Sequence, residues 1–81
     1  MYLHICKNMI IKTENIIGIF DINSIKETKE FQELFFQLKE RNQLIDISES
    51  MQKSFILIKE NQENKAYISN VSVATLEKRI N

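Results

Sequence analysis

The chain has 81 residues, of which 43% are hydrophobic and 27% are charged, and its eleven Lys and Arg residues balance its eleven Asp and Glu residues. This length fits one domain, residues 1–81, and the high apolar content with zero net charge argues against a disordered chain. A domain of this size buries only about 60–65% of the surface that its unfolded chain exposes. We therefore expect a thin core that self-association supplements.

The composition also excludes several kinds of site. Cys6 is the single cysteine and His4 the single histidine, so the sequence offers neither an internal disulfide nor a typical zinc cluster. One glycine is too few for a glycine-rich phosphate loop, and we expect no cofactor. The longest apolar runs, 9–11 and 55–58, are far shorter than the ~20 residues of a membrane helix, and the N-terminus lacks the apolar core of a secretory signal. We expect a cytoplasmic protein without a membrane partner.

Residues 2–20 have the pattern of short β-strands. β-branched and aromatic residues cluster there in short runs, separated by polar breaks at 7–8 and 12–15. The pattern predicts two or three strands, one of which contains Gly18. A single glycine inside a strand indicates a bulge or a close backbone approach.

The clearest helix signal follows these strands. Ser24 and Glu27 have the spacing of a capping box, in which each side chain satisfies a free backbone N–H at the helix start. The spacing predicts a helix from about Ile25 to about Arg41 that ends near Asn42. Its apolar stripe, at positions i, i+3, i+4 and i+7, consists of Phe31, Leu34, Phe35 and Leu38.

The second half of the chain alternates extended and polar segments. Residues 44–47 read as a short strand and 48–52 as a loop. A buried strand at 55–58 pairs with 66–69 around a polar loop at 60–64, and a helix capped by Ser72 covers 73–80. The order of strands, long helix, hairpin and C-terminal helix predicts an α+β fold, with both helices on one face of a small antiparallel sheet.

Catalysis has little support in the sequence. His4 and Cys6 would share one face of a strand, so a cysteine–histidine nucleophile pair is an alternative. A third residue that would orient the imidazole is not apparent. A half-buried strand histidine beside a small buried cysteine is the simpler interpretation. Since the carboxylates are scattered without a paired acid, we expect no enzyme.

Phe36 does not fit the apolar stripe of the long helix. It lies about 140° from Phe31 on a helical wheel, and Ile25 projects near the same side. One exposed phenylalanine needs no explanation. Two apolar strips on one helix, in a domain with a thin core, instead indicate a subunit interface at Phe36 and Ile25.

Basic residues are few and local. No bulk charge would draw the protein onto nucleic acid. Lys12 lies in the early strand connection and Lys53 ends the polar loop; both are either plain surface lysines or phosphate contacts. Lys78 and Arg79 suit the last turn of a helix, where cations favour the helix dipole.

Four segments carry a resemblance to a known family: MYLHI at 1–5, IIKTENIIGIFD at 10–21, KSFILI at 53–58 and SVATLEKR at 72–79. Together they resemble the RemA/RemB family of small bacterial extracellular-matrix regulatory proteins, and the RemB branch more closely. Leu44-Ile45-Asp46 is similar to the RemA branch.

The resemblance implies a small α+β protomer that assembles into a ring-shaped homo-oligomer. In the RemA branch the ring binds DNA and activates biofilm-matrix and osmoprotection genes. A ring would repeat a few lysines by symmetry and so create a multivalent surface for a polyanion. The chain departs from the RemA pattern in two places. Glu14-Asn15 stands where that branch has an arginine, and Met51-Gln52 aligns with its arginine pair.

These observations predict a non-enzymatic transcription regulator of extracellular-matrix and biofilm genes. It would act as a ring-shaped homo-oligomer that binds duplex DNA weakly through Lys53, Lys12 and Lys7. Phe36 and Ile25 would lie at the subunit interface. The alternative is an oligomeric protein-interaction module of the same fold, which has lost DNA binding together with the arginines.

Overall fold

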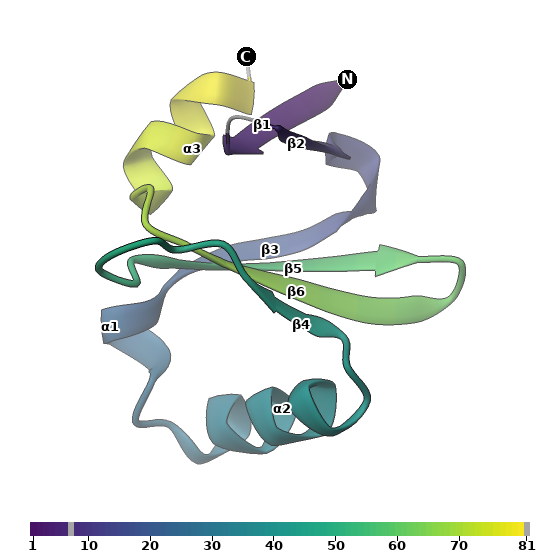
Figure 1. The fold of residues 1–81 in the computed structure, drawn as a ribbon, viewed down its shortest axis with the longest axis vertical. Coiled ribbons are helices and arrows are strands. Elements are labelled where there is room, and N and C mark those ends of the chain that lie inside the picture. The colour runs from purple at the N-terminus through teal and green to yellow at the C-terminus, as the bar shows by residue number, and fades with distance from the viewer. Residues whose placement is uncertain (7, 81) are drawn as a thin grey trace.

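The structure, a computed structural model, describes residues 1–6 and 8–80 (Figure 1). Strands occupy the first and central parts of the chain, with one long helix between them and another helix at the end. The elements in chain order are β1 (Tyr2–Cys6), β2 (Met9–Lys12), the 3-10 turn η1 (Thr13–Asn15), β3 (Ile16–Asp21), α1 (Ile22–Ile25), α2 (Lys29–Glu40), β4 (Leu44–Asp46), β5 (Ser54–Glu60), β6 (Glu63–Ser69) and α3 (Val73–Ile80).

The centre of the fold is a four-stranded sheet with the order β3-β5-β6-β4. β5 runs antiparallel to both of its neighbours, as expected, but the edge strand β4 runs parallel to β6. β3 and β4 therefore point the same way, and α2 is the crossover connection that parallel strands need. The prediction of an antiparallel sheet is wrong at this one edge. The strands β1 and β2 form a separate hairpin.

The two faces of the sheet are covered by different elements. α2 lies on one face, whereas α3 and the β1–β2 hairpin lie on the other, with both chain ends (Figure 1). Phe55 packs in a cluster with Leu38 of α2, and Ile56 packs in a second cluster with Leu76 of α3. The expectation of helices on a single face is wrong, because the unbroken apolar run at 55–58 needs cover on both sides.

β3 contains the irregularity predicted at Gly18. The pairing of β3 with β5 shifts register between Ile16 and Gly18, which marks a bulge. A Cβ atom on Gly18 would lie 2.6 Å from Cζ of Phe20. The predicted bulge is confirmed; the close neighbour of Gly18 is the side-chain ring of Phe20 and not another backbone segment.

The long helix begins later than the sequence predicted. The Oγ1 of Thr28 accepts a hydrogen bond from the N–H of Phe31 at 3.2 Å and donates one to the carbonyl of Ile25 at 2.8 Å. Thr28 thereby ends α1 and caps α2 at once. The predicted capping role of Ser24 is wrong, since Ser24 lies inside the short helix α1.

The remaining helix ends follow the prediction. Asn42 takes a left-handed conformation with φ of 57°, directly after the C-terminal turn of α2. The Oγ of Ser72 accepts a hydrogen bond from the N–H of Thr75 at 3.2 Å, which confirms the cap of α3.

The hairpin of β5 and β6 is tighter than the predicted loop at 60–64. Asn61 and Gln62 both have positive φ, at 53° and 66°, as in a two-residue type I′ turn. The paired strands extend to Glu60 and Glu63 at this turn.

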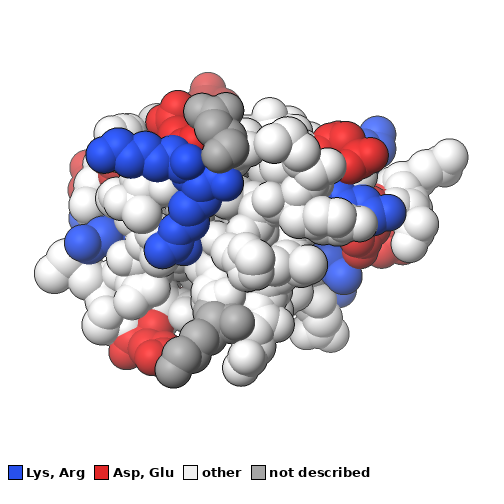
Figure 2. Space-filling model, turned by 90° about the horizontal axis from the view of Figure 1, so that it is seen from above, with Lys and Arg blue, Asp and Glu red and all other residues white. Residues whose placement is uncertain are grey.

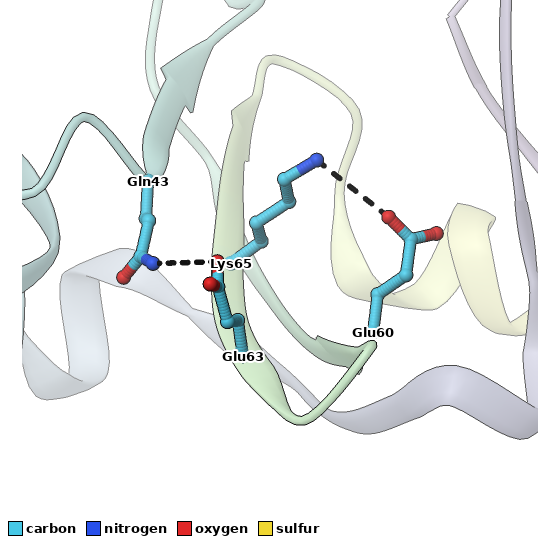
Figure 3. Close-up of polar contacts among 4 residues, drawn as sticks. All are labelled: Gln43, Glu60, Glu63 and Lys65. Carbon is cyan, nitrogen blue, oxygen red and sulfur yellow. Dashed lines mark hydrogen bonds and ion pairs between the residues drawn. The ribbon is translucent and has the colours of Figure 1, made fainter.

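Polar contacts hold the strands beside this turn (Figure 3). The Nζ of Lys65 lies 3.6 Å from Oε1 of Glu60, across the hairpin. The Nε2 of Gln43, just before β4, donates to Oε2 of Glu63 at 3.1 Å. The first contact lies within the hairpin, and the second ties the start of the parallel edge strand to it.

Replacing Thr28 with alanine is expected to lower the free energy of unfolding by about 1 kcal/mol, because the first turn of α2 loses its cap. Urea unfolding followed by circular dichroism measures this change. Ser24→Ala serves as the matched control and should have little effect. If Ser24→Ala destabilised the protein more than Thr28→Ala, the assignment of the cap would be wrong.

Candidate nucleic-acid and subunit interfaces

Lys53 lies at a rigid junction of three elements. Its backbone N–H donates to the carbonyl of Ser69 at 2.8 Å, and its carbonyl accepts from the N–H of Ile22 at 3.0 Å. The backbone is therefore held between β6 and α1, while the residue itself is exposed. A lysine anchored in this way has a fixed backbone position at the surface, from which its flexible side chain extends.

The loop before Lys53 is organised by Asp46. Oδ1 of Asp46 accepts from the backbone N–H of Ser48 at 2.9 Å and also from its hydroxyl, and Oδ2 accepts from Nε2 of Gln52 at 3.0 Å. The hydroxyl and backbone N–H of Ser48, followed by Gln52, lower the pKa of Asp46 below its ordinary value of 3.8. Gln52, at a position where the RemA pattern has an arginine, thus has a role within the protomer.

Lys12 lies at the other end of the sheet. It ends β2, and the following 3-10 turn leads to Ile16, which pairs with Ile58 near the far end of β5. Lys53 directly precedes the first residue of β5. A strand of six residues spans roughly 17–20 Å, so one protomer does not bring Lys12 and Lys53 together. The third predicted contact, Lys7, lies outside the described residues.

The described residues on the face formed by α3 and the β1–β2 hairpin do not make a broad basic surface. In Figure 2 one patch of basic side chains lies inside the outline of this face and others lie nearer its edge, several of them next to acidic side chains, and uncharged atoms fill much of the area between them. The described residues of a single protomer therefore form no continuous basic track for a polyanion on this side.

Two lysines that the sequence did not single out line a groove together with Gln52, the residue before Lys53. This groove of about 470 Å³ runs along one flank of α2, and Lys26, Lys39 and Gln52 line it. None of its described lining residues is acidic. Lys26 lies in the short connection between α1 and α2, where the helix is interrupted. The apolar periodicity of the sequence did not predict this interruption.

The structure separates the two predicted interface residues. Phe36 is 63% exposed, which agrees with its position off the apolar stripe. Ile25 belongs to α1 and is half-buried beside the α2 cluster. Because the helix is interrupted at 26–28, the single apolar strip expected from the helical wheel does not form. Ile25 instead lines a second groove, together with Leu34, on the opposite flank of α2.

His4 and Cys6 line the same hollow, of about 900 Å³, between β1, the loop after β4 and the end of α3. His4 is exposed rather than half-buried, and Cys6 is half-buried. Nη1 of Arg79 donates to the backbone carbonyl of His4 at 3.2 Å. This bond joins α3 to β1 and leaves the imidazole itself without an orienting contact among the described hydrogen bonds.

Two kinds of feature are absent from the described part of the chain. Within residues 1–6 and 8–80, no group of three or more His, Cys, Asp or Glu side chains is placed to hold a metal ion. The helices found there are also too short and too polar to cross a bilayer.

Asp46→Ala is expected to destabilise the protein at neutral pH, because Ser48 and Gln52 lose their acceptor. A carboxylate whose pKa is lowered on folding stabilises the fold above its unfolded pKa, and this contribution is lost as the pH falls through the folded pKa. The difference in the free energy of unfolding between wild type and variant should therefore become smaller below about pH 4.

Urea unfolding at pH 7 and at pH 3 measures this difference. Glu49→Ala, which removes a carboxylate from the same loop, is the control and should have little effect at either pH. If the difference in the free energy of unfolding between wild type and Asp46→Ala were larger at pH 3 than at pH 7, the stabilising role of the ionised carboxylate would be contradicted.

Comparison with known proteins places the chain in one family. The RemA-like family, described as extracellular matrix regulatory protein A-like, matches residues 2–80. A search of the curated proteins gave no match. Because the family match covers nearly the whole sequence, the chain belongs to the RemA-like family of extracellular matrix regulatory proteins.

Proposed function

We propose that the protein is a non-enzymatic, cytoplasmic regulator of extracellular-matrix and biofilm genes, which binds duplex DNA weakly as a ring-shaped homo-oligomer. Membership of the RemA-like family supports a role in matrix regulation. We propose that the chain lies nearer to the RemB branch, on the likeness of its segments 1–5, 10–21, 53–58 and 72–79.

The observation that carries the proposal is the placement of Lys53 and Lys12 near opposite ends of the four-stranded sheet, with Lys53 just before β5 and Lys12 in the hairpin that leads into β3. Copies that join side by side, across the direction of the strands, repeat Lys53 as a row along one rim and Lys12 along the other. Each row gathers cations that a single neutral protomer keeps apart. Repetition multiplies a weak contact with a phosphate backbone.

Lys26 strengthens the row at the Lys53 end. It lines the same groove as Gln52, the residue before Lys53, and it is exposed. Lysines contact phosphate as flexible point charges, whereas arginines bind it through two parallel hydrogen bonds. A surface built from lysines is consistent with weak binding that is independent of DNA sequence and sensitive to salt.

We propose no catalytic role for His4 and Cys6. A cysteine nucleophile needs a base that a third group holds in place. The described contacts give the imidazole of His4 no such partner, and Arg79 binds its backbone instead.

The alternative function, an oligomeric module that binds another protein, has one observation in its favour. Met51 is 69% exposed at one position of the RemA-type arginine pair. An exposed methionine suits a protein partner better than a phosphate. In this alternative the protein still forms the oligomer but does not bind DNA.

Lys53→Glu is expected to weaken DNA binding by about tenfold or more at low salt, because each copy in the row then repels phosphate. Fluorescence anisotropy with labelled duplex DNA at several salt concentrations measures the effect, and the salt dependence should become shallower. Lys78→Glu makes the same charge change on α3, across the sheet from α2, and should weaken binding much less. An equal loss of DNA affinity in the two variants would show that Lys53 is not a specific contact. If the wild type bound no DNA, Lys53 would not be a DNA contact and the protein-binding alternative would be favoured.

Phe36→Glu is expected to shift the protein toward monomer, because a charge replaces an exposed apolar side chain at the contact between copies. Light scattering on a sizing column gives the mass. Ala74→Glu, an exposed change on α3, is the control and should leave the mass as in the wild type. An unchanged mass for Phe36→Glu would place the interface elsewhere.

A further inference from the structure

We propose that Phe36 of each copy inserts into the groove on the opposite flank of α2 in the next copy, the groove that Ile25 and Leu34 line. This inference rests on the proposed assembly and names the two surfaces that meet in it. The contact would be of the head-to-tail kind, with a different patch of each copy on its two sides.

The projecting partner is Phe36. Its side chain is 63% exposed, although phenylalanine buries a large apolar area when it is covered. The other two aromatic residues of α2, Phe31 and Phe35, are half-buried and stack on each other with ring centres 5.6 Å apart. Phe36 alone among these three points away from the protomer's own core.

The receiving groove lies between α2 and the strands β3 and β5. It measures about 220 Å³, and its apolar walls include Phe20, Ile25, Leu34 and Leu57. An apolar cavity of about 150 Å³ is large enough to hold benzene. The groove therefore has room for one phenyl ring, and it lies beside β3, an edge strand of the sheet.

The two surfaces cannot meet within one protomer. Phe36 follows Leu34 by two positions, which separates them by about 200° around the helix. They thus occupy opposite flanks of α2, whose axis lies roughly along the strands (Figure 1). A contact that joins opposite flanks places copies side by side, and it generates a ring where the rotation between copies closes. This is the arrangement that aligns Lys53 into a row.

On one side of Phe36 the charges complement those of the receiving groove, whereas on its other side Lys29 and Glu33, of opposite charge, line a hollow together with it. Glu30 is the charged residue among those that line the receiving groove. Lys39, one turn after Phe36, lines the groove on the projecting flank together with Lys26. When Phe36 is inserted, Lys39 of one copy comes toward Glu30 of the next, and opposite charges at the margin of an apolar contact set its orientation. An acidic peptide in the same groove would be repelled by Glu30. A second copy of this chain, which brings Lys39 to this place, is therefore the better occupant.

Cysteine crosslinking tests the pairing without removing the aromatic contact. In a Cys6→Ser background, Lys39→Cys and Glu30→Cys are prepared separately and then mixed under mild oxidation. We expect a disulfide-linked dimer in the mixture and none in either variant alone. A single chain that carries both changes should give a ladder of linked species.

The outcomes separate this inference from the assembly itself. A linked dimer in Lys39→Cys alone would show a symmetric contact and overturn the inference. An absence of links in the mixture, while light scattering shows the variants as oligomers, would also overturn it and leave the assembly standing. A wild type that stays monomeric at high concentration would overturn both.

Complementation provides a second test that does not depend on disulfide geometry. Phe36→Glu blocks the projecting side, and Phe20→Lys blocks the groove. Each variant alone should be monomeric, and their mixture should form a dimer through the one intact contact, which light scattering detects. A mixture that stays monomeric, with both variants folded by circular dichroism, would contradict the pairing.

Discussion

The fold depends on covering both faces of β5. This strand and its neighbour β6 supply six of the twelve buried hydrophobic residues of the described chain, and consecutive residues of β5 belong to different hydrophobic clusters. A short chain has to supply two covers from few residues. It uses α2 for one face, and α3 with the β1–β2 hairpin for the other. Each cover is a single layer, so the flanks of α2 stay open.

The open flanks of α2 connect the fold to the proposed assembly. Phe36 and the groove beside β3 are the open flanks of the single long helix. Copies that close these flanks against each other complete the apolar cover, and by the same step they line up the lysines at the ends of the sheet. Stability and polyanion binding would then arise from one interaction, which explains how a neutral chain could bind DNA.

Local patterns in the sequence predicted most elements, and tertiary contacts decided the rest. The apolar periodicity placed the body of α2, and the glycine in β3 indicated its bulge. Ser24 and Thr28 are both acceptable caps, and Thr28 became the cap because its hydroxyl also bonds the end of α1. The direction of β4 was not predictable, because three residues carry no signal of parallel pairing. The separation of Lys12 from Lys53, and the nearness of Lys26, depend on strand order, which one sequence does not reveal.

The central claim is that the protein acts as a closed assembly of identical copies. Native mass spectrometry of the wild type over a range of concentrations tests it most directly. We predict one dominant species at a fixed multiple of the protomer mass, because a ring closes at a definite number of copies. A spectrum that shows only the protomer at every concentration would contradict the claim.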